Sequence, residues 1–145
     1  MTFDDDQFDA FLADITDPFL TGDITRWIAR IRLPFALITQ TGPVTLTTLQ
    51  EVTENFNLYL VAMKALKADL IIREKVGSEH CHDGTVIATY RSHFLRQGNR
   101  LRAPYTASAL LHPDGGLWRM SSILNALGHH HWTGKHPYPS GEEET

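Results

Sequence analysis

The sequence is poor in cysteine and has no excess of positive charge. Cys81 is the single cysteine among 145 residues, so the chain cannot form an internal disulfide, as is typical of proteins in a reducing cytoplasm. The 13 lysines and arginines stand against 17 aspartates and glutamates, which gives a formal net charge of -4. A mildly acidic chain offers no basic surface for a phosphate backbone, so we expect no nucleic-acid partner.

Long apolar runs are also lacking. No stretch approaches the ~18 apolar residues of a membrane span. The first residues, MTFDDDQFD, lack the basic start and apolar run of a signal peptide. We therefore expect a cytoplasmic protein without a membrane partner. At 42% hydrophobic residues the chain can bury a core, so we predict one domain over residues 1–127 and a C-terminal tail over residues 128–145.

Apolar residues at helical spacing mark the first half of the chain. Residues 8–19 carry such a stripe with aspartates in the preceding turn, and residues 23–31 suit a short second helix. The sequence Thr48-Leu-Gln-Glu51 is a capping box, which predicts the start of a long helix whose apolar stripe runs to Leu66. Short strands are expected at residues 33–38 and 44–46.

After Asp69 the pattern changes to long strand-like runs separated by turn residues. Gly98-Asn99 suits a two-residue hairpin turn, which fixes the register of the strands on either side. One face of this hairpin is then consistently apolar, which supports the register because a one-residue slip would scramble it. The predicted pairs are Phe94–Ala103, Ser92–Tyr105, Tyr90–Ala107, Ala88–Ala109 and Val86–Leu111.

Two further loops predict the register of the outer runs. A four-residue loop at residues 113–116 predicts the pairs Leu111–Trp118, Ala109–Met120, Ala107–Ser122 and Tyr105–Leu124. A three-residue loop at residues 82–84, with glycine where a left-handed residue is needed, predicts the pairs Val76–Tyr90, Glu74–Ser92 and Ile72–Phe94. In this register the even-numbered residues of the first run face the apolar side. Glu74, rather than Arg73 or Lys75, is therefore predicted on the apolar face.

The order of these elements, with the final sequences Tyr105-Thr-Ala-Ser108 and Gly115-Gly-Leu-Trp118-Arg119-Met120, resembles the nuclear transport factor 2-like superfamily over about residues 5–125. That superfamily includes ketosteroid isomerase, scytalone dehydratase and the SnoaL-like polyketide cyclases. The resemblance implies an α+β fold in which N-terminal helices pack on a curved, mainly antiparallel sheet to form a cone. It further implies a pocket on the concave face and a homodimer through the outer face. The isomerase's catalytic residues have no matching positions in this sequence.

The predicted concave face offers candidate catalytic and binding residues. Burial of Glu74 among tyrosines and hydrocarbon would favour its protonated form, so Glu74 suits a general acid or base. Tyr105 suits stabilisation of an oxyanion. The candidate substrate-binding residues are Tyr90, Ser92, Ser122, Met120, Trp118 and Tyr59. They predict a site for a small apolar or carbonyl-containing molecule, with no cofactor. One hypothesis is a cofactor-free isomerase, cyclase or dehydratase, and the alternative is a non-catalytic dimerisation or ligand-sensing module.

One other interpretation of the sheet stays open. If the opposite sheet face forms the pocket, the ligand would be anionic and Arg91, His93 and Arg119 would hold it. The stretch SEHCHDG offers possible metal ligands, but His80 and Cys81 are adjacent in a strand and point to opposite faces. The adjacent histidines at residues 129–131 cannot all point one way either, so we predict no native metal site.

Overall fold

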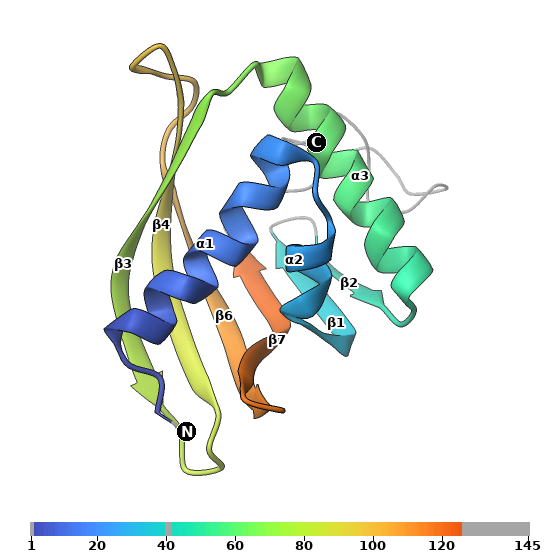
Figure 1. Cartoon of the computed structure of the whole chain (residues 1–145), viewed down its shortest axis with the longest axis vertical. Helices are drawn as coiled ribbons and strands as arrows, with labels where there is room; N and C mark the ends of the chain where they lie inside the picture. Colours follow the sequence, from blue (N-terminus) through green and yellow to red (C-terminus); the bar gives the residue numbers. More distant parts are fainter. Residues whose placement is uncertain (1, 40–41, 126–145) are drawn as a thin grey trace.

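The computed structural model describes residues 2–39 and 42–125, which form three helices and a seven-stranded sheet (Figure 1). The predicted tail at residues 128–145, with its histidines, lies outside this range. In chain order the elements are α1 (Asp5–Thr21), α2 (Thr25–Ala29), β1 (Ile31–Thr39), β2 (Gly42–Leu46), α3 (Leu49–Leu66), β3 (Leu70–His80), β4 (Val86–Arg96), β5 (Asn99–Arg100), β6 (Tyr105–Asp114) and β7 (Leu117–Asn125).

The two long helices begin at capping residues that are evident in the sequence. The Asp4 side chain accepts a hydrogen bond from the Gln7 amide at 2.9 Å at the start of α1. At the start of α3 the Thr48 hydroxyl accepts a hydrogen bond from the Glu51 amide at 3.1 Å. The carboxylate of Glu51 returns to the Thr47 amide at 3.0 Å, so the predicted capping box forms with its second bond one residue earlier.

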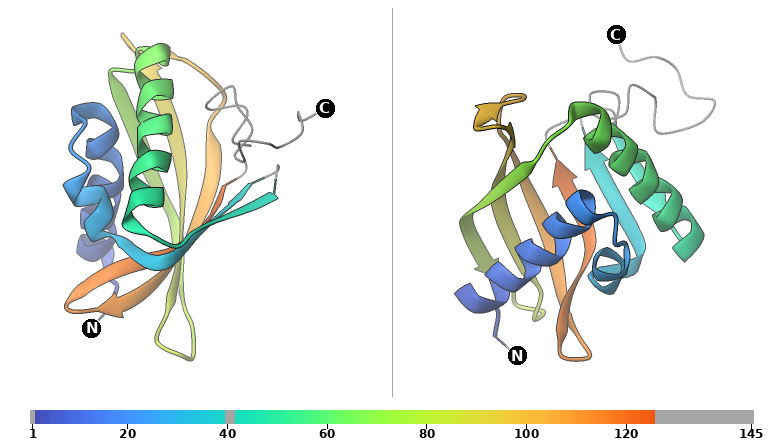
Figure 2. Two further views of the ribbon diagram at one scale, coloured as in Figure 1. Left: turned by 90° about the vertical axis from the view of Figure 1, so that its right-hand side faces the viewer. Right: turned by 45° about the horizontal axis from the view of Figure 1, so that its top comes forward.

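The sheet has the strand order β2-β1-β7-β6-β4-β3, with β5 paired to β4 outside this path. β1 and β7 run parallel, and the other neighbouring strands run antiparallel. The sheet is strongly curved, and the helices lie on its concave side (Figures 1 and 2). This arrangement covers the apolar face of the sheet with the apolar stripes of α1 and α3.

Most of the predicted pairing between β4 and β6 is confirmed, from Val86↔Leu111 to Ser92↔Tyr105. The predicted turn that joins β4 to the next strand is wrong by one residue. Arg96 pairs with Asn99, so the two turn residues are Gln97 and Gly98, with φ of 50° and 79°. Both residues have positive φ, as a tight hairpin turn between twisted strands requires. The irregular residues 101–104 then restore the predicted register.

The predicted four-residue loop between β6 and β7 is also wrong. Asp114 pairs with Leu117 across a two-residue turn, in which Gly115 and Gly116 have φ of 60° and 82°. Two consecutive glycines take these values without steric strain, so the tighter turn is favoured. The register then shifts between Leu110 and Leu111 and moves Ser122 to the convex side; the resulting pairs include Leu111↔Met120, Leu110↔Ser122, Ala109↔Ile123 and Ala107↔Asn125.

The strand β3 contains a β-bulge at Val76 that changes the predicted concave face. The three-residue loop before β4 is confirmed, because the Cys81 amide bonds the Thr85 carbonyl at 2.9 Å and Gly84 has φ of 87°. Beyond the pair Gly77↔Thr89, however, the next pair is Lys75↔Tyr90, and Val76 is left over. Arg73 therefore lies opposite Ser92, and the predicted pair Glu74–Ser92 is wrong.

Charges on both sides of the sheet favour the bulge. On the concave side Lys75 Nζ reaches the carboxylate of Asp9 at 2.9 Å and that of Asp5 at 3.7 Å, both on α1. On the convex side Glu74 Oε1 lies 2.6 Å from His93 Nε2. A regular ladder would turn Glu74 toward the side on which the aspartates of α1 lie, which is electrostatically unfavourable.

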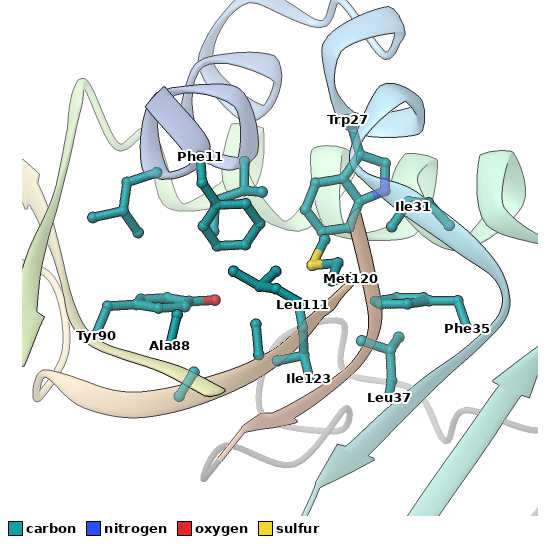
Figure 3. Packing of buried hydrophobic residues seen from close by; sticks show 14 of the residues in the cluster. Phe11, Trp27, Ile31, Phe35, Leu37, Ala88, Tyr90, Leu111, Met120 and Ile123 are labelled. Carbon is teal, nitrogen blue, oxygen red and sulfur yellow. The ribbon is translucent and has the colours of Figure 1, made fainter. Parts of the chain in front are cut away.

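The hydrophobic core fills the space between the helices and the sheet. Figure 3 shows Phe11 and Trp27 above the sheet residues Leu111 and Met120, with Phe35 beside them. Among the described residues, no helix has both the length and the apolar character needed to cross a membrane.

Candidate functional site

A cavity of about 70 Å³ lies between the helices and the concave face of the sheet, near one end of β1 and β7. By this measure it has room for several water molecules. We call it the Arg73 cavity. Its apolar walls are Ile15, Phe19, Trp27, Leu37, Met63, Ile71, Phe94 and Ile123, and its polar residues are Thr39, Asn55, Tyr59, Arg73, Tyr90, Tyr105 and Asn125.

Arg73 is held in the cavity wall by two hydroxyl groups. Its Nε donates to Thr16 Oγ1 on α1 at 2.9 Å, and its Nη1 donates to Ser92 Oγ on β4 at 2.7 Å. Thr16 in turn donates to the Leu12 carbonyl at 2.5 Å, so its hydroxyl accepts from Arg73. The guanidinium carbon also lies 5.6 Å from the centre of the Tyr90 ring, which gives a favourable cation–π contact.

Among the described residues no carboxylate pairs with Arg73. The seven carboxylate pairs of this part of the chain involve other basic side chains, namely those of Arg26, Arg30, Lys75, His93 and Arg119. The hydroxyls of Thr16 and Ser92 are neutral, and both residues are buried. The positive charge of Arg73 therefore borders the cavity without a counter-charge from the described residues.

The tyrosines of the cavity come from three different elements. Burial raises the pKa of Tyr59 on α3 well above its usual range, and the nearby Tyr105 adds to this effect. Burial also raises the pKa of Tyr90 to about 12, with Arg73 opposing the shift and Tyr105 adding to it. Tyr59 and Tyr90 are therefore protonated at neutral pH and can donate hydrogen bonds. No described residue forms a hydrogen bond with the Tyr90 hydroxyl, although Tyr90 is only 3% exposed.

Of the residues that the sequence predicts for the site, Tyr59, Tyr90 and Tyr105 come together in the cavity. Ser92 is fully buried behind the cavity wall and fixes Arg73. The other predicted binding residues are not among the lining residues. Trp118 lies deeper in the core, with its ring 5.5 Å from that of Phe3. Met120 is also buried in the core, and Ser122 is on the convex side of β7.

The predicted catalytic pair of Glu74 and Tyr105 does not assemble. Glu74 points to the convex side, where its side chain is 53% exposed and contacts His93. Tyr105 lies in the cavity, stacked on Phe94 with 5.7 Å between ring centres. The bulge at Val76 is the reason, because it inverts the side of every β3 residue that precedes it.

Sequence reasoning missed four polar residues of the cavity: Thr39, Asn55, Arg73 and Asn125. For Arg73 a signal existed. Asp5 and Asp9 follow one another at helical spacing on α1 and attract Lys75, and Arg73 shares a strand face with Lys75. Asn125 faces the cavity because of the register shift between β6 and β7. The sequence has no comparable signal for that shift. The alternative pocket on the opposite face is not supported, since Arg91 is exposed and Arg119 Nε lies 3.5 Å from Asp114.

No protein-family model matches the sequence, and no curated protein matches it either. Many solved structures match its three-dimensional arrangement. A nuclear transport factor 2-like protein of unknown function from Shewanella oneidensis superimposes with a TM-score of 0.62 at 10% identity, over 84% of this chain and 98% of that chain. The chain has the nuclear transport factor 2-like, cystatin-like fold. The predicted fold class, α+β with N-terminal helices on a mainly antiparallel sheet, is thereby confirmed.

Two other matches agree with this fold. A domain of unknown function with a cystatin-like fold from Nostoc punctiforme gives a TM-score of 0.66 at 14% identity, over 90% of this chain and 82% of that chain. The structure of Aln2 from a Streptomyces species gives a TM-score of 0.64 at 17% identity, over 83% of this chain and 87% of that chain. At these identities the likeness extends to the fold alone, and proteins of this fold differ widely in chemistry.

Proposed function

We propose that this protein binds a small organic molecule in the Arg73 cavity. The observation that supports the proposal is the composition of the cavity wall. Eight apolar residues line the cavity together with seven polar residues, which reach it from β1, α3, β3, β4, β6 and β7. Largely apolar pockets with a few convergent polar groups are typical of small-molecule sites.

The lining favours binding over acid–base catalysis. The cavity residues of the described chain include no aspartate, glutamate, histidine or lysine. Tyr59 and Tyr90 have raised pKa values, so neither phenol accepts a proton at neutral pH. An isomerase or dehydratase needs a group that removes a proton, and Glu74 lies on the other side of the sheet. We therefore infer a carrier or sensor of a small molecule.

A substitution that fills the cavity with a larger side chain tests this proposal. Ile123 lines the cavity, while the next residue, Leu124, is 58% exposed on the convex side. The probes are phenylacetate and phenylacetamide, titrated by isothermal calorimetry. We expect Ile123→Phe to weaken binding at least tenfold and the matched control Leu124→Phe to leave it unchanged, with circular dichroism showing that both variants fold. Binding that survives Ile123→Phe, or no binding of either probe at millimolar concentration, contradicts the proposal.

Apolar residues on the convex face favour a second candidate function, dimerisation through that face. Ile38 on β1 pairs with Leu124 on β7, and both are exposed, as is Ile72 on β3. Exposed apolar side chains that lie side by side are typical of association surfaces. Analytical ultracentrifugation at micromolar concentration tests this candidate. We expect a dimer that Leu124→Lys converts to a monomer, and a monomeric wild type would exclude it.

A further inference from the structure

The charges around the Arg73 cavity point to the chemical class of its ligand. Of the described residues that line the cavity, Arg73 alone is charged. The same protein also contains a buried arginine with a different partner. Arg30 is 2% exposed, and its Nε donates to the Asp14 carboxylate at 2.8 Å. Arg73 has hydroxyl partners where Arg30 has a carboxylate, so of these two arginines only the one at the cavity lacks a counter-charge among the described residues.

The contacts of Arg73 also leave donors for a ligand. A guanidinium has about five N–H groups in one plane, and the bonds to Thr16 and Ser92 use one from Nε and one from Nη1. The remaining N–H groups belong to Nη1 and Nη2, which form the end of the guanidinium. Two parallel N–H groups are the arrangement that binds a carboxylate through both oxygens. Thr16 and Ser92 hold the group from two different elements, so little side-chain freedom remains to be lost on binding.

The phenols and the apolar wall complete the recognition. Tyr90 has no acceptor among the described residues, and its neutral hydroxyl is a hydrogen-bond donor. Ile15, Phe19 and Met63 supply apolar surface for the body of a ligand. We propose that the natural ligand is a small organic acid, whose carboxylate binds Arg73 and whose apolar or aromatic body fills the cavity. This inference rests on the proposed small-molecule function and narrows its ligand class.

Phenylacetate and phenylacetamide separate charge from shape, because they differ only in the acid and amide groups. In the wild type we expect the acid to bind at least tenfold more tightly than the amide. Arg73→Met keeps the apolar stem and removes the charge. It should weaken acid binding by roughly tenfold to a hundredfold, as expected for a charged hydrogen bond, and change amide binding by less than about threefold. Arg73→Lys should retain part of the preference, and Arg100→Met, on the exposed strand β5, should change nothing.

The outcomes distinguish the two proposals. Equal affinity of the acid and the amide in the wild type overturns the organic-acid inference and leaves the small-molecule function standing. An acid preference that persists in Arg73→Met also overturns it, because another group then supplies the charge. If neither probe binds, the small-molecule function itself fails. The comparison of the two probes in the wild type needs no variant, so it decides the matter even if Arg73→Met does not fold.

Discussion

Replacing Tyr90 with phenylalanine should remove a pH dependence from the stability of the protein. Burial raises the pKa of Tyr90 to about 12, whereas the unfolded chain releases this proton near pH 10. Between these values the unfolded state binds fewer protons than the folded state, so the free energy of unfolding falls as the pH rises. The contribution of Tyr90 is complete below pH ~10 and decreases by roughly 1 to 2 kcal/mol by pH ~11.

Urea unfolding at pH 8 and pH 11 measures this effect. At pH 8 Tyr90→Phe should be nearly neutral, because no described residue bonds the hydroxyl that is removed. At pH 11 the variant should have gained roughly 1 to 2 kcal/mol relative to the wild type. Lysines and other tyrosines titrate in both proteins, so their effects cancel in the difference. If the two proteins lose the same free energy between pH 8 and pH 11, the assigned burial of the phenol is wrong.

Three further predictions concern the fold. Val76 is unpaired and 60% exposed, so its deletion should change the free energy of unfolding by about 1 kcal/mol or less and preserve phenylacetate binding. A larger destabilisation together with loss of binding would show that the bulge is misplaced. Thr48→Ala removes a helix cap and should destabilise the protein by about 1 kcal/mol in urea unfolding. The control Thr53→Ala, one turn further into the same helix, should be close to neutral. Arg30→Met leaves the Asp14 carboxylate with less compensation and should cost about 3 kcal/mol, seen as a lower melting temperature; an unchanged melting temperature would contradict the structural role of this ion pair.

The sequence predicts the elements of the fold well because each has a local cause. The cap at Thr48 and the alternation around Tyr90 depend on neighbouring residues, and both the helix start and the central pairing are correct. Even the wrong loop at Gly115 leaves Trp118 and Met120 on the concave side. Shortening that loop from four residues to two moves the register by two residues. A shift by an even number leaves each side chain on the same face of the sheet.

The cavity was harder to predict because a shift of one residue in strand pairing turns each side chain to the opposite face of the sheet. The shift in β7 exchanges Ser122 for Ile123, and the bulge in β3 exchanges Glu74 for Arg73. A bulge has no residue signature of its own, and at Val76 it is favoured by contacts with α1, which lies far away in the sequence. Tyr90 and Tyr105 reach the cavity because the two strands that carry them are paired as predicted.

The bulge at Val76 also affects how relatives of this protein should be compared. An ungapped alignment column equates residues by count, but the bulge makes the orientation of a side chain depend on how the strand is paired. Two homologues could have identical residues in this strand but differ in the bulge. The regular strand would place the negative Glu74 on the cavity side, and the bulged strand would place the positive Arg73 there. A ligand class should therefore be transferred between relatives only after their strand pairing is known.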